Sequence, residues 1–217
     1  MFYRIFDKTK NRPLFYHNKR GLPRYREQYH KAKKVCAEWG CNMRLFIAIN
    51  FNDKVKDSLC DSIARLKKMA LKGNFTRREN LHLTLVFIGE TNKVEAVKQA
   101  MASISALPFE LSIGGVGRFN RDGGDIYWAG VNKNIVLTDI YNQLCGELRK
   151  KGFILENRAY KPHLTLGREV VVPKIFNEKE FAESVPHMNM IIDSVSLMKS
   201  ERINSKLTYT EVYRKQF

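Results

Sequence analysis

The sequence lacks several features that would place it in common protein classes. It has no apolar run near the roughly 20 residues of a membrane-spanning helix, and no apolar core of a secretion signal near its N-terminus. Its four cysteines form no CxxC pair and have no accompanying histidine pattern, which argues against a zinc site. Free thiols suit a reducing compartment. We therefore expect a cytoplasmic protein with no membrane span, no metal ion and no cofactor.

Acidic residues are scarce relative to basic ones. The chain has 38 Lys and Arg against 22 Asp and Glu, a net charge of +16. Such a surplus favours polyanions, meaning nucleic acid, nucleotides or an anionic membrane surface. Residues 1–42 hold 11 basic and 3 acidic residues and account for half of this surplus. The remainder is only moderately basic, which suits a phosphate-bearing substrate.

The character of the chain changes at Met43. The preceding residues are basic, contain Pro13 and Pro23, and show few aliphatic side chains and no clear period. Such a segment has little apolar surface to offset its ordering entropy. From Met43 the sequence MRLFIAINF is typical of a buried strand. We expect residues 1–42 to be a flexible extension or an over-extended start, and residues 43–217 to form the functional domain.

The apolar pattern of this domain predicts alternating strands and helices. A helix precedes an H-L-T-L strand in each half, and the two copies lie 81 residues apart. This echo predicts an α+β fold of two pseudo-symmetric lobes, each a mostly antiparallel sheet with helices packed outside, facing a shared cleft. Helices are expected at about 53–70, 91–104, 134–151 and 174–184. Strands are expected at about 43–51, 80–89, 109–119, 125–131 and 161–169, with a closing hairpin over 188–200 and 206–217 that turns near residues 202–204.

The repeated tetrapeptide carries the chemistry. His82-Leu83-Thr84-Leu85 recurs as His163-Leu164-Thr165-Leu166. In a strand, residues i and i+2 point to one face, so each copy presents an imidazole with a hydroxyl while both leucines enter the core. Two imidazoles suit displacement at phosphorus, because one takes a proton from water and the other gives one to the leaving oxygen. The threonine hydroxyls can donate to phosphoryl oxygens, and the arrangement needs no metal.

A single His-x-Thr on a strand is usually a half-buried histidine that its neighbour satisfies. Two of the five histidines begin the same tetrapeptide here, which is rare by chance and favours catalysis. His17, His30 and His187 have no such partner and receive no role.

With these motifs in place, the sequence resembles the two-histidine phosphoesterase superfamily, and within it the RNA 2′,3′-cyclic phosphodiesterases, also called 2′-5′ RNA ligase-like proteins. MRLFIAI, NLHLTLVFIGE and RAYKPHLTLGR carry the resemblance, which covers about residues 43–217. It implies that His82 is the general acid, that His163 is the general base, and that Thr84 and Thr165 hold the phosphate. Water would open a 2′,3′-cyclic phosphate at an RNA end, tRNA-derived ends among them, and leave a 2′-phosphate. The expected enzyme is a monomer.

Three further residues are candidate substrate contacts. Arg168 follows the second motif closely enough to reach a phosphate. Arg118 and Phe119 combine a cation with a stacking ring, although a core phenylalanine beside a surface charge has the same pattern.

Two other functions remain open at this stage. One is a phosphodiesterase of the same fold that acts on another cyclic phosphate, such as ADP-ribose 1″,2″-cyclic phosphate. The other is a basic, non-catalytic RNA-binding protein, for which paired imidazoles and hydroxyls would serve no purpose.

Overall fold

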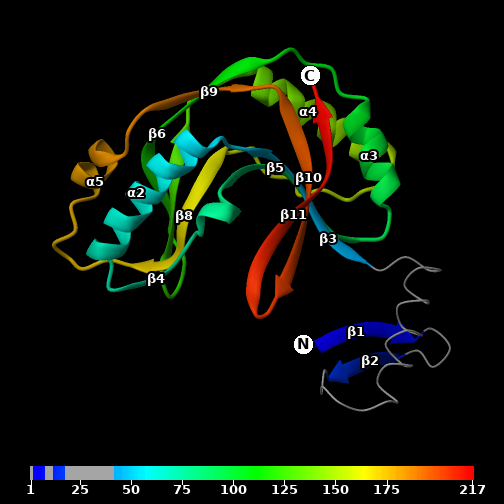
Figure 1. Cartoon of the computed structure of the whole chain (residues 1–217), viewed down its shortest axis with the longest axis horizontal. Helices are drawn as coiled ribbons and strands as arrows, with labels where there is room; N and C mark the ends of the chain where they lie inside the picture. Colours follow the sequence, from blue (N-terminus) through cyan, green and yellow to red (C-terminus); the bar gives the residue numbers. More distant parts are fainter. Residues whose placement is uncertain (1, 8–11, 18–41) are drawn as a thin grey trace.

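The computed structural model describes residues 2–7, 12–17 and 42–217 (Figure 1). Strands β1 (Phe2–Asp7) and β2 (Arg12–His17) pair with each other in an antiparallel two-stranded sheet. The sequence pattern did not indicate these two strands. The rest of the N-terminal extension lies outside the described residues, so the domain boundary at Met43 stays a prediction.

Two antiparallel sheets form the body of the protein, as the internal repeat predicted. The four-stranded sheet has the order β11-β10-β3-β5 and the five-stranded sheet the order β4-β8-β7-β6-β9. We call the first sheet and its helices the His82 lobe, and the second sheet and its helices the His163 lobe. The strands of the His82 lobe are β3 (Met43–Asn50), β5 (His82–Thr91), β10 (Ser194–Ile203) and β11 (Lys206–Gln216). The strands of the His163 lobe are β4 (Lys72–Phe75), β6 (Phe109–Phe119), β7 (Asp125–Val131), β8 (His163–Val171) and β9 (Met188–Ile192).

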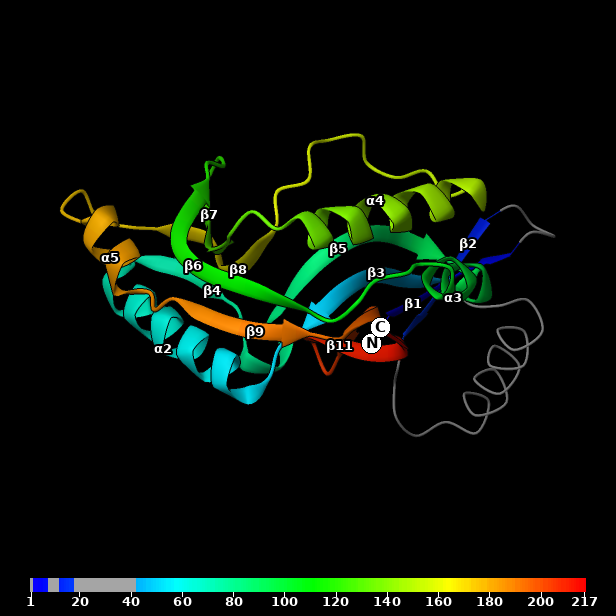
Figure 2. The ribbon, with the colours of Figure 1, turned by 90° about the horizontal axis from the view of Figure 1, so that it is seen from above.

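The helices are exchanged between the lobes. Helix α2 (Asp53–Met69) follows β3 along the chain but packs against β4 and β8 of the other sheet. Helix α4 (Ile135–Lys150) follows β7 but packs against β5 and against α3 (Val94–Ala102). Figures 1 and 2 agree that α2 and α5 (Glu178–Ser184) lie at one end of the molecule and α3 and α4 at the other. This exchange ties the two lobes into one body.

Local sequence explains where the main helices begin and which face they bury. The side chain of Asn52 accepts a hydrogen bond from the backbone N–H of Val55 and starts α2, and Asn134 does the same for Leu137 in α4. Val55 and Leu59 lie on the face of α2 that is almost fully buried. Each such aliphatic side chain contributes roughly 1.5–3 kcal/mol by leaving water.

Several local expectations need correction. Strand β9 pairs with β6 of the His163 lobe instead of joining the closing hairpin. The hairpin itself forms from β10 and β11, and its turn lies at Asn204 and Ser205, which have positive φ angles of 48° and 65°. The short strand β4 and the 3-10 helix η1 (Arg78–Asn80) had no clear sequence signal.

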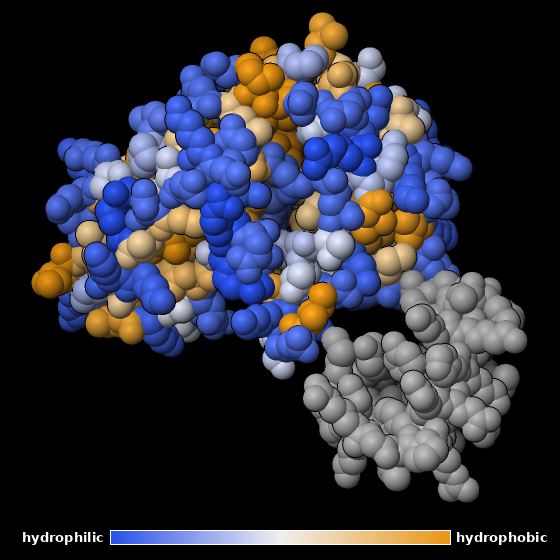
Figure 3. Space-filling model, in the orientation of Figure 1, coloured by the Kyte–Doolittle hydropathy of each residue, from blue (hydrophilic) through white to orange (hydrophobic). Residues whose placement is uncertain are grey.

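The outer surface is mostly hydrophilic in the view of Figure 3, with hydrophobic residues in separate small patches. Among the described residues, no helix has both the length and the apolar character that crossing a membrane requires.

Candidate active site

The two H-x-T strands meet where the lobes meet. Strand β5 is the edge strand of its sheet, and it lies next to β8, which sits between β4 and β7 in the other sheet. In both strands the histidine and threonine are half-buried. The leucines that alternate with them, Leu83 and Leu164 among them, are fully buried. The structure therefore brings the two predicted motifs together with the expected facing.

His82 is fixed in one tautomer by the backbone. Its Nδ1 lies 2.7 Å from the carbonyl oxygen of Asn80. A carbonyl can only accept, so Nδ1 carries the proton and Nε2 is the nitrogen that titrates. In the neutral ring Nε2 accepts from the hydroxyl of Thr84, 3.0 Å away.

His163 repeats this geometry in the other lobe. Its Nδ1 donates to the carbonyl oxygen of Lys161 at 2.7 Å, again two residues earlier in the chain. Its Nε2 is thus also the titrating nitrogen. Within the described part of the chain Nε2 of His163 has no hydrogen-bond partner, and Thr165 makes no side-chain hydrogen bond of the kind that Thr84 makes.

Contacts on η1 hold the carbonyl of Asn80 in place. Asn80 is buried, and its side-chain amide donates to the carbonyl oxygen of Leu207 on β11 at 3.0 Å. Arg78 binds Asp53 and Asp57 of α2, each at 2.8 Å. The short helix before the first motif is thereby attached to an element of each lobe. These contacts could not be inferred from the sequence, because they join residues up to 127 positions apart.

Each histidine packs against aromatic rings of its own lobe. His82 lies 4.9 Å from Phe46 and 5.1 Å from Tyr209, measured between ring centroids. His163 lies 5.0 Å from Phe119 and 6.0 Å from Trp128.

A glycine makes room for one of these rings. A Cβ atom at Gly117 would lie 2.2 Å from the ring of Trp128, its neighbour across the β6–β7 pair. Glycine at this position therefore lets the indole lie over the strand beside His163. Phe46, Tyr209 and Trp128 have no sequence signal that places them at the site, because aromatic residues on strands usually pack in the core.

The candidate contacts differ in where they lie. Phe119 touches His163, whereas Arg118 points to the other face of β6 and pairs with Asp125 at 3.2 Å and Glu178 at 3.3 Å. Arg118 therefore forms its ion pairs with carboxylates on the face of β6 that is turned away from the histidines. Arg168 is exposed and makes no ion pair within the described residues.

The electrostatics of the site are set by burial and by Arg168. Burial lowers the pKa of both His82 and His163, the hydrogen bond to a backbone carbonyl opposes this shift, and the positive charge of Arg168 lowers each pKa further. A charge on His163 also lowers the pKa of His82. Both imidazoles therefore favour the neutral form more than a free histidine does, and an anion bound among these cations would raise the pKa of both.

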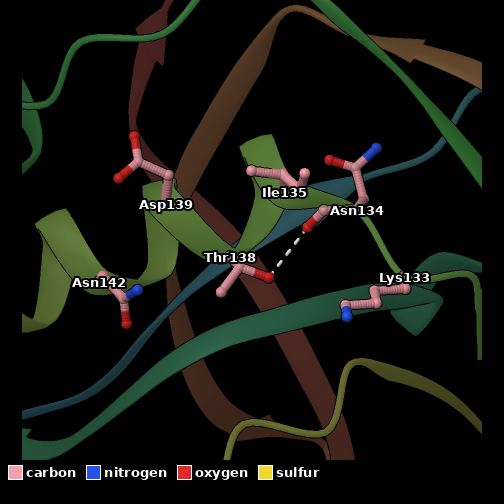
Figure 4. Close-up of a pocket in the computed structure, with 6 residues that line it drawn as sticks. All are labelled: Lys133, Asn134, Ile135, Thr138, Asp139 and Asn142. Carbon is pink, nitrogen blue, oxygen red and sulfur yellow. Dashed lines mark hydrogen bonds between the residues drawn. The ribbon is translucent and has the colours of Figure 1, made fainter.

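Other groups of the described residues do not form a competing centre. No cluster of three or more His, Cys, Asp or Glu suited to a metal ion occurs among them. A surface pocket at the start of α4 is lined by six residues, and the hydroxyl of Thr138 donates there to the carbonyl of Asn134 at 2.9 Å (Figure 4). The pocket contains neither H-x-T motif.

The two antiparallel sheets have exchanged helices, and each sheet presents a histidine and a threonine at the junction between them. This arrangement defines the two-histidine phosphoesterase class. The model of the 2′-5′ RNA ligase superfamily matches residues 55–207, and the chain belongs to this superfamily.

Individual relatives agree with this placement. The RNA 2′,3′-cyclic phosphodiesterase of Methanothermobacter thermautotrophicus is 32% identical over 185 residues, 79% of this chain and 98% of the relative. The protein of the same name from Thermotoga maritima is 29% identical over 184 residues, 81% of this chain and 96% of the relative. Among solved structures, LigT of E. coli in its apo form has a TM-score of 0.68 at 22% identity, over 82% of this chain and 98% of that one. This last likeness shows the fold.

Proposed function

We propose that the protein hydrolyses the 2′,3′-cyclic phosphate at an RNA end to a 2′-phosphate, with His82 and His163 as its acid–base pair. The superfamily and the names of the curated relatives support the class of reaction and the RNA substrate. The observation that carries the chemical part is the shared tautomer. Both imidazoles commit Nδ1 to a backbone carbonyl, so both keep Nε2 for proton transfer at one junction.

The proposed reaction is a single displacement at phosphorus. Nε2 of His163 takes a proton from water as the water oxygen attacks phosphorus. The bond between phosphorus and O3′ breaks, and protonated Nε2 of His82 gives its proton to O3′. The 2′-ester bond is kept, which yields the 2′-phosphate. The hydroxyls of Thr84 and Thr165 donate to the non-bridging oxygens, where negative charge is concentrated.

Thr84 must exchange partners during this sequence. In the structure its hydroxyl donates to Nε2 of neutral His82. Once that nitrogen is protonated it no longer accepts, and the hydroxyl becomes free to donate to the phosphate. Arg168 lies within electrostatic range of both imidazoles and adds a fixed positive charge for the anion.

Product analysis on three substrates tests the proposal. These are a dinucleotide ending in a 2′,3′-cyclic phosphate, a mononucleotide 2′,3′-cyclic phosphate and ADP-ribose 1″,2″-cyclic phosphate. Phosphorus NMR of the dinucleotide product should show only the 2′-phosphate, with the same rate in excess EDTA. A 3′-phosphate product, loss of activity on chelation, or faster turnover of the ADP-ribose compound would contradict the proposal. A matched variant, His187→Ala, removes an imidazole outside the two motifs and should leave the rate unchanged.

A further inference from the structure

A row of side chains leads away from His82 along the β3–β5 pair. Across these two strands Asn50 faces His82, Ala48 faces Thr84 and Phe46 faces Phe87. Directly paired residues on neighbouring strands project to the same face of a sheet. Phe87 therefore lies on the face that carries the first motif, further along the edge strand.

Arg44 adds a cation at the outer end of this row. Its guanidinium carbon lies 5.0 Å from the ring centroid of Phe87. Phe87 is 41% exposed, although residues on the opposite face of these strands pack into the core, and Arg44 is exposed as well. Glu90 is paired with Arg44 in the strand register, yet Arg44 makes no ion pair within the residues that the structure describes.

Tyr209 connects this outer pair with the histidines. Its ring packs edge-on against Phe46 at 4.9 Å and against His82 at 5.1 Å. The charges of Arg168 and Arg44 both lower the pKa of Tyr209, while burial, the larger effect, raises it. Both arginines thus lie within electrostatic range of one ring. The face thus carries a group of aromatic rings between a cation near the histidines, Arg168, and a cation at its outer end, Arg44.

This pattern has the chemistry of a single-stranded nucleic-acid subsite. Bases stack on exposed aromatic rings with little regard to sequence, and arginines bind the phosphates between them. A terminal cyclic phosphate occupies the 3′ end of an RNA strand. When it sits between the histidines, the strand can continue only in the 5′ direction, away from the reacting phosphorus. An open cationic and aromatic face beside His82 offers such a strand a surface.

We infer that Arg44 and Phe87 form a second nucleotide subsite, which binds the phosphate and base immediately 5′ of the terminal nucleotide. The inference rests on the proposed function for what occupies the histidine site. It makes the preferred substrate an oligonucleotide end and not a mononucleotide. Phe87 supplies a stacking surface, Arg44 binds the bridging phosphate, and Tyr209 lines the path between this subsite and His82.

Kinetics on substrates of two lengths test the subsite. Cytidine 2′,3′-cyclic phosphate probes the histidine site alone, and a trinucleotide with the same terminus probes both sites. Arg44→Gln and Phe87→Leu should each lower kcat/KM for the trinucleotide about tenfold, the usual size of a lost stacking or phosphate contact, and leave the mononucleotide within about twofold. Arg149→Gln removes the same charge from the exposed end of α4 and should change neither value.

A binding experiment separates this inference from the proposed reaction. Fluorescence anisotropy of a labelled trinucleotide ending in a 2′-phosphate should give a Kd about tenfold weaker for Arg44→Gln than for Arg149→Gln. If no cyclic phosphate is turned over but this difference appears, the proposed function fails and the subsite stands. Equal losses on both substrate lengths, or no loss on either, would overturn the subsite. The subsite would also be overturned if Arg44→Gln weakened binding of a poly-glutamate peptide but not binding of the trinucleotide.

Discussion

The two lobes present the same tetrapeptide in different surroundings. In both, the histidine donates Nδ1–H to the carbonyl two residues earlier at 2.7 Å. In the His82 lobe that carbonyl belongs to buried Asn80, whose side chain is held by β11. In the His163 lobe it belongs to exposed Lys161. His82 also lies on an edge strand and His163 on an interior strand.

The difference shows how one repeated motif can lie in two different environments. The tetrapeptide and the two residues before it set what is local, namely the tautomer and the shared face of imidazole and hydroxyl. The lobe sets what is not local, namely depth of burial, the partner of Nε2 and the aromatic neighbours. His82 is the more deeply buried of the two imidazoles and already has Thr84 as a partner. Burial disfavours the protonated form of both rings, so the bound phosphate must raise the pKa of His82 for this ring to act as the proposed acid.

The largest expected effect concerns the histidines themselves. His82→Ala and His163→Ala should each lower kcat on a cyclic-phosphate dinucleotide by roughly a hundredfold or more, the usual contribution of an acid or base. Binding of the 2′-phosphate product should survive far better than turnover. Steady-state kinetics and anisotropy measure the two quantities. If one variant retained near-full activity, the lobes would not share the reaction, and the paired assignment would be wrong.

The next prediction concerns the residues whose backbone carbonyls hold the two imidazoles. Asn80→Ala keeps the backbone carbonyl but removes the contact with Leu207, so we expect kcat to fall about tenfold with KM little changed. The free energy of unfolding should fall by roughly 1–3 kcal/mol, the cost of a lost buried hydrogen bond. Lys161→Ala, the matching change in the His163 lobe, should alter stability by less than about 0.5 kcal/mol. If the two substitutions had equal effects on kcat and on urea unfolding, the two imidazoles would be held equally well in the two lobes, contrary to this prediction.

A third effect is the pH dependence of stability. Burial lowers the pKa of His82 and of His163 in the folded protein, whereas the unfolded chain titrates near the ordinary value of about 6.5. As pH falls below that value the unfolded state binds protons first, so stability should drop, and it should recover as pH rises. Melting temperatures between about pH 5 and 7.5 measure this. His82→Gln should flatten the profile more than His163→Gln, because His82 is the more buried, and identical slopes in all three proteins would refute the assignment.

The smallest effect concerns the hydroxyls. The hydrogen bond from Thr84 stabilises neutral His82, so Thr84→Val should raise the pKa of His82 by less than about one unit. Because the proposed acid must be protonated, the alkaline limb of the kcat/KM profile should shift upward accordingly. Thr165→Val removes a hydroxyl with no such bond to His163 and should lower activity without moving this limb. A shift of equal size in both variants would show that the hydroxyls act alike on their imidazoles.

Much of the site could be predicted from the chain itself because strand alternation is local. His82 and Thr84 share a face whatever their sheet, and the same holds for His163 and Thr165. The repeat also indicated two lobes, and apolar runs located most strands. Single residues outside the motifs could not be placed by strand alternation alone. Arg118 and Phe119 looked equivalent in sequence, but they lie on opposite faces of β6. Arg118 pairs with two carboxylates, and Phe119 packs against His163.

The sequence alone thus determined the pairing of imidazole and hydroxyl within each motif and the two-lobed α+β class. Only the tertiary structure decided that α2 packs on the sheet of the His163 lobe, that α4 packs on the sheet of the His82 lobe, and that β9 joins the His163 lobe. It also decided which residues surround the imidazoles, namely Asn80, Phe46, Tyr209 and Trp128. The reason is the range of the interactions. Periodicity and turn preferences act over a few residues, whereas these contacts join segments far apart in the chain, and they are selected by the packing of the whole core.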